Sequence, residues 1–252
     1  MNIKREFMDL WHEYFGGSEM PIVFYYTDIP LREKMAKSIE DGQWRCFMAD
    51  LARVRKGETV CFAADSIGCA GARDYLGFER NRMPNFEYFL SYGVPGQMEG
   101  ERYKKSPELV RDAMGRMPEF NAPAPYIIFK RWDQLDDANR PDVVIFFARP
   151  DVLSGLFTLS SFDEAEASTV YAPFTAGCGS IVKFPYLEKD TVHPRCVIGM
   201  FDVSARPYVP EDTLSFAVPM VKFEQMVRNV KESFLITPSW GKVKKRIEKA
   251  AS

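Results

Sequence analysis

The chain has 252 residues, of which 46% are hydrophobic and 14% aromatic, and its 33 lysines and arginines nearly balance 35 aspartates and glutamates. This composition supplies enough apolar side chains for a large core and excludes an intrinsically disordered chain. A formal net charge of −2 creates no broad positive electrostatic field that would attract nucleic acid or anionic lipid, so neither is an expected partner. We expect one domain over residues 1–252.

The N-terminal sequence and the cysteine content indicate a cytoplasmic protein. The chain starts with a charged amphipathic segment instead of the apolar stretch and small-residue cleavage site of a signal peptide. No run approaches the roughly 18 uninterrupted apolar residues of a transmembrane helix, so no membrane association is expected. Five scattered cysteines, an odd number, favour free thiols or metal ligands over a disulfide framework.

The first predicted element is an amphipathic helix. Phe7, Leu10, Trp11 and Tyr14 recur at helical spacing on one face, and two glycines follow where a C-terminal cap belongs. The β-branched and aromatic run at residues 22–26 is typical of a buried strand. A helix followed by a strand fits an α/β or α+β protein.

Further short apolar runs predict the other strands, with segments between them long enough to hold helices. These runs cover residues 60–64, 126–129, 143–148 and 197–201. Such spacing is typical of a single layered domain with a mixed arrangement of sheet and helices, in the α/β or α+β class.

Two hydroxyl–proline pairs predict helix starts. Ser106 before Pro107 and Thr237 before Pro238 each place a hydroxyl at the N-cap and proline at the first helical position, where its missing N–H costs nothing. Between the predicted elements, residues 93–105 are rich in glycine. This stretch is predicted to be a surface excursion, with a lid over a site as the alternative.

The familiar signatures of catalytic and cofactor sites are missing from the sequence. His12 and His193 are the only histidines, too few for histidine-rich zinc sites and poor material for Ser-His-Asp catalysis. There is no G-x-G-x-x-G, no phosphate-binding loop and no G-x-S-x-G elbow. The acids at 136–137 and 163–166 are predicted to be helix-start or solvated charges. No catalytic residue is assigned, and whether the protein is an enzyme stays open.

Two cysteines occupy nearly the same setting of small residues. With their flanking glycines they are Gly68, Cys69 and Gly71 in one segment and Gly177, Cys178 and Gly179 in the other. A thiol near a helix N-terminus has its anionic form favoured by the helix dipole, and flanking glycines let a ligand approach the backbone. Both properties suit a metal ion, an iron–sulfur cluster or an anion.

The remaining cysteines differ in their settings. Cys46 lies in a short mixed segment and Cys61 at the start of a predicted strand, and either can supply a further thiolate if the fold brings it close. Cys196 is predicted to be a core strand residue. Free cysteine is often buried, and the sequence has no C-x-x-C spacing, so a purely structural role for these thiols is the competing interpretation.

Several segments, taken in order, resemble a known family. They are residues 21–23, 45–47, 68–77, 177–178, 185–186, 201–206, 216–219, 232–235 and Trp240. Together they resemble the uncharacterised ArCR family, labelled domain of unknown function 169, over most of the chain. The resemblance implies a single domain, a prokaryotic origin and an unassigned biochemical role, and it supplies no catalytic residues.

The resemblance also divides the cysteines into those inside and those outside the family-like stretches. Cys46, Cys69 and Cys178 fall in the most family-like stretches, whereas Cys61 and Cys196 lie where no family cysteine is expected. A four-cysteine cluster is therefore not indicated, and three cysteines leave one coordination position open. Our first hypothesis is that these three cysteines bind an iron–sulfur cluster or a single metal.

Two other hypotheses stay open. In the second, backbone N–H groups at the Gly68 and Gly177 turns hold a small anionic ligand without catalysis, and Arg73 or Arg206 completes the site. In the third, the protein has a structural or subunit role, with its aromatic side chains covering an interface. The sequence does not predict the oligomeric state.

Overall fold

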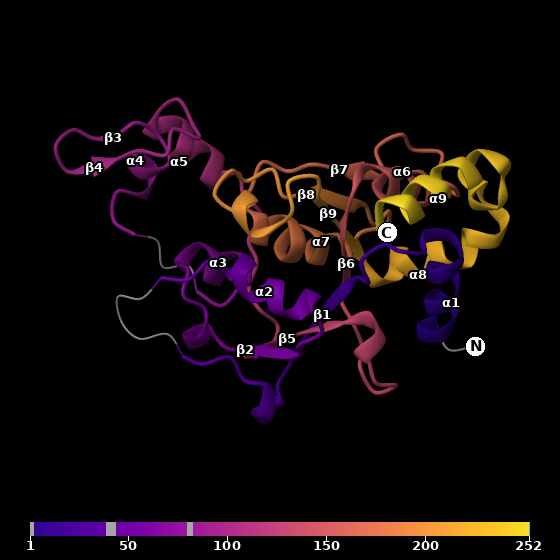
Figure 1. Cartoon of the computed structure of the whole chain (residues 1–252). Coiled ribbons are helices and arrows are strands. Elements are labelled where there is room, and N and C mark those ends of the chain that lie inside the picture. The colour runs from indigo at the N-terminus through magenta and orange to yellow at the C-terminus, as the bar shows by residue number, and fades with distance from the viewer. Residues whose placement is uncertain (1–2, 39–43, 80–82, 252) are drawn as a thin grey trace.

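The computed structural model describes residues 3–38, 44–79 and 83–251 and contains one large mixed sheet with helices on both faces (Figure 1). In sheet order the strands are β2 (Val60–Phe62), β5 (Tyr126–Arg131), β1 (Ile22–Thr27), β6 (Val143–Ala148), β9 (Leu214–Pro219), β8 (Cys196–Gly199) and β7 (Val170–Tyr171). All neighbours pair antiparallel except β7 and β8, which are parallel. The predicted mixed sheet-and-helix class is confirmed.

The five predicted strands are present, with small differences at their ends. The run predicted at 60–64 stops at Phe62, because residues Ala64–Ser66 form a 3₁₀ turn. The run predicted at 197–201 ends at Gly199, because Met200 takes a left-handed backbone conformation with φ of 68°. Sequence analysis did not predict β9, although it pairs with both β6 and β8.

Alternation of side chains along the strands divides the buried residues into two cores. Val23, Val144 and Phe216 belong to the first core, and their neighbours Phe24 and Ala217 belong to the second. Because successive strand residues point to opposite faces, the two cores lie on opposite faces of the sheet.

Each core is covered by its own set of helices (Figure 1). The helices on the first core are α1 (Ile3–Phe15), α6 (Pro150–Ser160), α8 (Met220–Asn229) and α9 (Pro238–Ala251). The helices on the second core are α2 (Phe47–Arg55), α3 (Ala70–Tyr75), the π-helical segment η4 (Gly179–Lys183) and α7 (Phe184–Glu188), which continues η4. None of the described helices combines the length and the apolar character needed to cross a membrane.

An arm projects from the second-core side of the molecule (Figure 1). It comprises α4 (Phe86–Phe89), the small hairpin of β3 (Gly93–Val94) and β4 (Met98–Glu99), and α5 (Pro107–Gly115). The predicted excursion at 93–105 therefore contains a hairpin. Both predicted helix starts are confirmed, since α5 begins after Ser106 and α9 begins after Thr237.

One of the acids predicted to be solvated takes part in a buried ion pair. Lys222, on α8, has no exposed side-chain surface, and its Nζ lies 2.7 Å from Glu164 Oε1 and 3.5 Å from Asp163 Oδ1. The prediction was therefore wrong for Glu164, whose side chain is 20% exposed. Asp136 fits the prediction, because its carboxylate pairs with Lys130 but stays largely in solvent.

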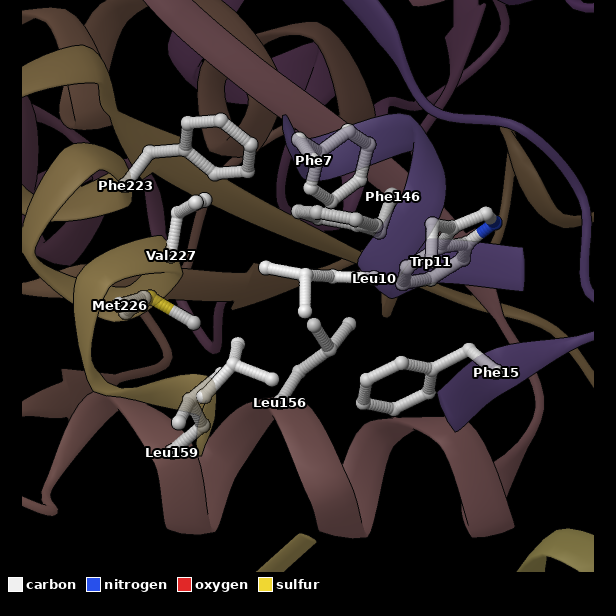
Figure 2. A pocket seen from close by; sticks show the side chains of 11 residues that line it. Phe7, Leu10, Trp11, Phe15, Phe146, Leu156, Leu159, Phe223, Met226 and Val227 are labelled. Atoms are coloured by element: carbon white, nitrogen blue, oxygen red, sulfur yellow. The ribbon is translucent and has the colours of Figure 1, made fainter. Parts of the chain in front are cut away.

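The first core is aromatic and tightly closed. It contains a void of about 20 Å³ that is wholly apolar, shown in Figure 2. Its lining includes Phe7, Leu10, Trp11, Phe15, Leu156, Phe223 and Met226. A space of this size is close to that of one water molecule and offers it no hydrogen-bond partner, so the void indicates a packing defect and no ligand site.

Gly155 allows α6 to pack directly against α9 and α1. A Cβ atom there would lie 2.5 Å from Trp240 Cη2 and 2.8 Å from Phe15 Cε1. The Trp240 ring is held in place because its indole N–H donates to the Tyr14 carbonyl at 3.0 Å. The absence of a side chain at this position is therefore required by the ring packing.

We expect Gly155→Ala to lower the free energy of unfolding by about 1–3 kcal/mol, because the new methyl group overpacks the core. The matched control is Gly241→Ala on α9, where a Cβ meets no atom within 4 Å. This control should raise stability by about 0.5–1 kcal/mol, because alanine restricts the unfolded chain more than glycine does. Urea unfolding followed by circular dichroism measures both. Equal effects of the two substitutions would contradict this account of Gly155.

Candidate functional site

Three cysteines lie at the N-terminal ends of three helical segments on the second core. Cys46 is the N-cap of α2, Cys69 is the N-cap of α3, and Cys178 directly precedes η4. Cys178 is part of the second core, and Cys46 and Cys69 pack against it from its edge. We call Cys46, Cys69 and Cys178 the thiol site.

The three thiols are close enough to influence one another's ionisation. Burial is the main cause that raises the pKa of Cys178 well above its ordinary value, and Cys69, Asp202 and Cys46 raise it further. Burial also raises the pKa of Cys46. Hydrogen bonds from the backbone N–H groups of Met48 and Ala49 lower the pKa of Cys46, whereas the nearby Cys69 and Asp202 raise it. The three cysteines that the sequence singled out therefore lie near enough to interact electrostatically.

Two consequences follow for the chemistry of these thiols. With raised pKa values, Cys46 and Cys178 are protonated at neutral pH when no metal is bound, which does not favour a reactive thiolate at either position. In the parts of the chain that the structure describes, no group of three His, Cys, Asp or Glu side chains could hold a metal ion.

Asp202 places a carboxylate beside the thiol site. Its Oδ2 accepts a hydrogen bond from the Gly177 N–H at 3.0 Å, and its Oδ1 accepts from the Ser204 N–H at 3.1 Å and the Ser204 hydroxyl at 2.8 Å. The backbone donor that the anion hypothesis assigned to Gly177 is therefore already used by an anion of the chain itself.

The backbone next to Asp202 is shaped for this contact. Met200 is buried and adopts a left-handed conformation, which a non-glycine residue takes only when its surroundings enforce it. This turn ends β8 and brings Asp202 back toward Gly177. A Cβ at Gly177 would lie 3.1 Å from both Met200 Sδ and Ala205 Cβ, so glycine is needed for the close approach.

The other predicted glycines serve different purposes. A Cβ at Gly179 would collide with the Thr175 hydroxyl and would lie 2.8 Å from the Tyr75 ring, so Gly179 lets α3 pack closely against η4. A Cβ at Gly71 would lie 3.7 Å from Cys69 Sγ, an ordinary contact. Gly68 is half-buried in the loop before Cys69.

The two arginines considered for an anion site are engaged elsewhere. Arg73 Nη1 lies 2.9 Å from Glu79 Oε2. The Arg206 guanidinium donates to backbone carbonyl groups, including that of Glu211 at 2.7 Å. Both guanidinium groups thus have partners within the chain, and the completion of an anion site by Arg73 or Arg206 stays a prediction.

Cys61 and Cys196 are not part of the thiol site. Cys61 is buried within β2, and burial raises its pKa. Cys196 belongs to the first core, on the opposite face of the sheet, where burial raises its pKa to about 12. The prediction that Cys196 is a core strand residue is confirmed.

A polar groove of about 670 Å³ lies next to the segment that leads into Cys46. Its walls include Arg45 and Arg53, and both arginines contact the buried carboxylate of Asp50, at 2.9 and 3.5 Å. These contacts anchor the start of α2. The groove is also lined by the charged residues Glu33, Lys34, Lys37 and Glu58.

Sequence reasoning missed Asp202, which lies 24 positions after Cys178 in the chain. A lone aspartate at the end of a strand is an ordinary feature, and only the fold sets it against Gly177. The sole signal was its place in a family-like stretch.

These features define a mixed α/β protein with a thiol site built from helix N-termini. The chain belongs to the family described as uncharacterised ArCR, domain of unknown function 169, whose model matches residues 16–229. The matched region contains the whole thiol site and Asp202 but leaves out α9. The family resemblance is thereby confirmed. Neither the curated proteins nor the solved structures contain a significant match to the chain.

The raised pKa values predict how the metal-free protein responds to an alkylating agent. Cys46 should react with iodoacetamide slowly at pH 7 and increasingly fast as the pH rises above about 9, because only the thiolate is nucleophilic. Cys178 should stay unmodified until the chain unfolds. Peptide mass spectrometry measures each rate, with the urea-unfolded chain as the control. Equal rates for Cys178 in folded and unfolded protein would contradict its burial.

Proposed function

We propose that the protein binds an iron–sulfur cluster through Cys46, Cys69 and Cys178. The observation that supports this most is the mutual influence of three thiols that come from separate segments of the chain. All three stand at the start of helical segments. Cysteine thiolates are the usual ligands of such clusters.

A cluster and a single metal ion require different spacings of the cysteine sulfurs. Around one tetrahedral zinc ion, with Zn–S bonds of about 2.3 Å, neighbouring sulfurs are only ~3.8 Å apart. The cysteines of a cluster bind different irons, so their sulfurs are farther apart. Because no group of three His, Cys, Asp or Glu side chains in the described residues could hold a metal ion, the proposal depends on the mutual influence of the thiols.

One electrostatic feature of the site, the start of α2, supports a bound anionic group. Helix N-termini stabilise negative charge, and the N–H groups of Met48 and Ala49 favour the Cys46 thiolate. Metal binding must displace the protons of Cys46 and Cys178, whose pKa values are raised, so binding competes with protons at these two thiols. Three cysteines leave one iron of a four-iron cluster without a cysteine ligand.

The test is reconstitution with ferrous iron and sulfide in the absence of oxygen. The protein should then hold both elements and absorb broadly near about 400 nm, and Cys69→Ser and Cys178→Ser should each lose most of the iron and the absorption. The matched control is Cys196→Ser, which changes a buried cysteine of the first core and should keep the cluster.

Circular dichroism and thermal unfolding show whether each variant is folded. The proposal fails if the folded parent protein takes up no stoichiometric iron and sulfide. It fails equally if folded Cys69→Ser and Cys178→Ser variants keep the parent content.

A further inference from the structure

We propose that the arm docks on a second copy of this chain, so that two chains exchange their arms in a symmetric dimer. The surface that receives the arm consists of Phe174, Phe201 and Val203, which we call the apolar patch. This inference goes beyond the proposed cluster and does not depend on it.

The arm carries more apolar surface than it can cover by itself. Helix α4 contains two phenylalanines and a tyrosine among its four residues, yet none of its residues is buried. In α5 only Pro107 and Val110 are buried, whereas Leu109 is 45% exposed, and Tyr92, next to the hairpin, is 49% exposed. Two short helices and a two-stranded hairpin are marginally stable in water without a core. A further surface is therefore needed to cover the arm.

The body of the same chain does not supply that surface. Figure 1 shows the arm standing out from the sheet and the helices that cover it. One contact with the body is made by Lys104, whose Nζ lies 3.9 Å from the centroid of the Phe174 ring. The arm thus touches the edge of the apolar patch of its own chain but keeps Tyr92 and Leu109 in solvent.

The shape of the arm is fixed before any docking. The Arg102 N–H donates to the Ser91 carbonyl at 2.8 Å, and the Glu101 N–H donates to the Phe89 carbonyl at 2.7 Å. The buried Ser91 hydroxyl donates to the Glu87 carbonyl at 2.7 Å. Because these bonds form within one chain, docking of the arm does not cost the entropy of ordering a loose loop.

The apolar patch is an exposed surface on one part of the body. Phe201 and Val203 belong to the turn after β8 that packs on Gly177, and Phe174 lies three residues before Gly177. Phe174 is 65% exposed, Phe201 56% and Val203 68%. Large apolar side chains that gather in solvent in this way mark an interaction surface.

A second copy of the chain covers both surfaces at once. A two-fold axis repeats every contact, so each arm covers the patch of the other chain and neither an arm nor a patch stays bare. An unrelated protein or a small ligand on the patch would leave the arm uncovered.

The exposed area is sufficient for such a dimer. A stable interface buries about 800 Å² on each partner, and with two equivalent contacts the patch needs to supply roughly half of this. At about 200 Å² for each aromatic side chain, the exposed parts of Phe174 and Phe201 alone amount to about 240 Å². Val203 adds to this area.

The experiment compares three variants of the full-length protein without added iron or sulfide. The arm variant combines Tyr92→Ser with Leu109→Glu, and glutamate at this position completes a capping box with Ser106, so α5 keeps its fold. The patch variant is Phe201→Glu. The matched control, Phe157→Glu, makes the same change at an exposed position of α6, which covers the opposite face of the sheet. Analytical ultracentrifugation over a concentration series measures the dissociation constants, and circular dichroism shows that each variant is folded.

We expect the parent protein and the control to be dimers. The arm variant and the patch variant should each raise the dissociation constant at least about tenfold, because each removes both arm–patch contacts. An equimolar mixture of these two variants should associate more tightly than either variant alone. Its mixed dimer keeps one intact contact, between the arm of the patch variant and the patch of the arm variant.

Three results overturn the inference. The first is a parent protein that stays monomeric throughout the concentration series. The second is a folded arm or patch variant that dimerises as tightly as the parent. The third is a mixture that associates no better than its components, because the arm and the patch would then not contact each other. None of these results bears on the proposed cluster, which is tested by its iron and sulfide content.

Discussion

The close packing around Gly177 is the constraint on which the thiol site depends. Because this residue has no side chain, Met48 from α2 and Met200 from the end of β8 both reach its Cα, with Met48 Cγ 3.6 Å from the position of a Cβ. Cys46 lies two residues before Met48, and Asp202 lies two residues after Met200. A side chain at Gly177 would push these segments outward and with them the groups that they carry.

Local patterns predicted the elements well because most of them are specified by neighbouring residues. Period-two and helical spacings, and the proline-marked start after Ser106, act within a few positions of the chain. The site differs, since Cys46 and Cys178 are 132 positions apart. The glycine-rich setting of the cysteines suggested that thiols form the site, and the family-like stretches reduced the candidates to three cysteines. Neither signal could show that these three cysteines lie close together in the fold or that Asp202 lies beside them.

The missed features share a physical cause. Strand β9 ends at Pro219 and is buried on both faces, so it lacks the alternation that marks a half-exposed strand. The partner of Glu164 is Lys222, which is 58 positions away. The burial of Lys222 is tolerated only because the carboxylates of Glu164 and Asp163 compensate its positive charge. Both features follow from contacts that form only when the sheet is complete.

The division of the sheet into two cores gives each face a different role. The first core is filled by aromatic rings, mostly in tilted or edge-on contact, and holds the buried thiol of Cys196. On the second face, helices start at the edge of the core, so their N-terminal ends leave Cys46 and Cys69 half-exposed while Cys178 is covered. A carboxylate from the chain caps the helix at Gly177, which stabilises this helix end. Any anionic group bound at the thiols therefore enters a site in which one helix end is already neutralised, and its charge is balanced mainly by the ends of α2 and α3.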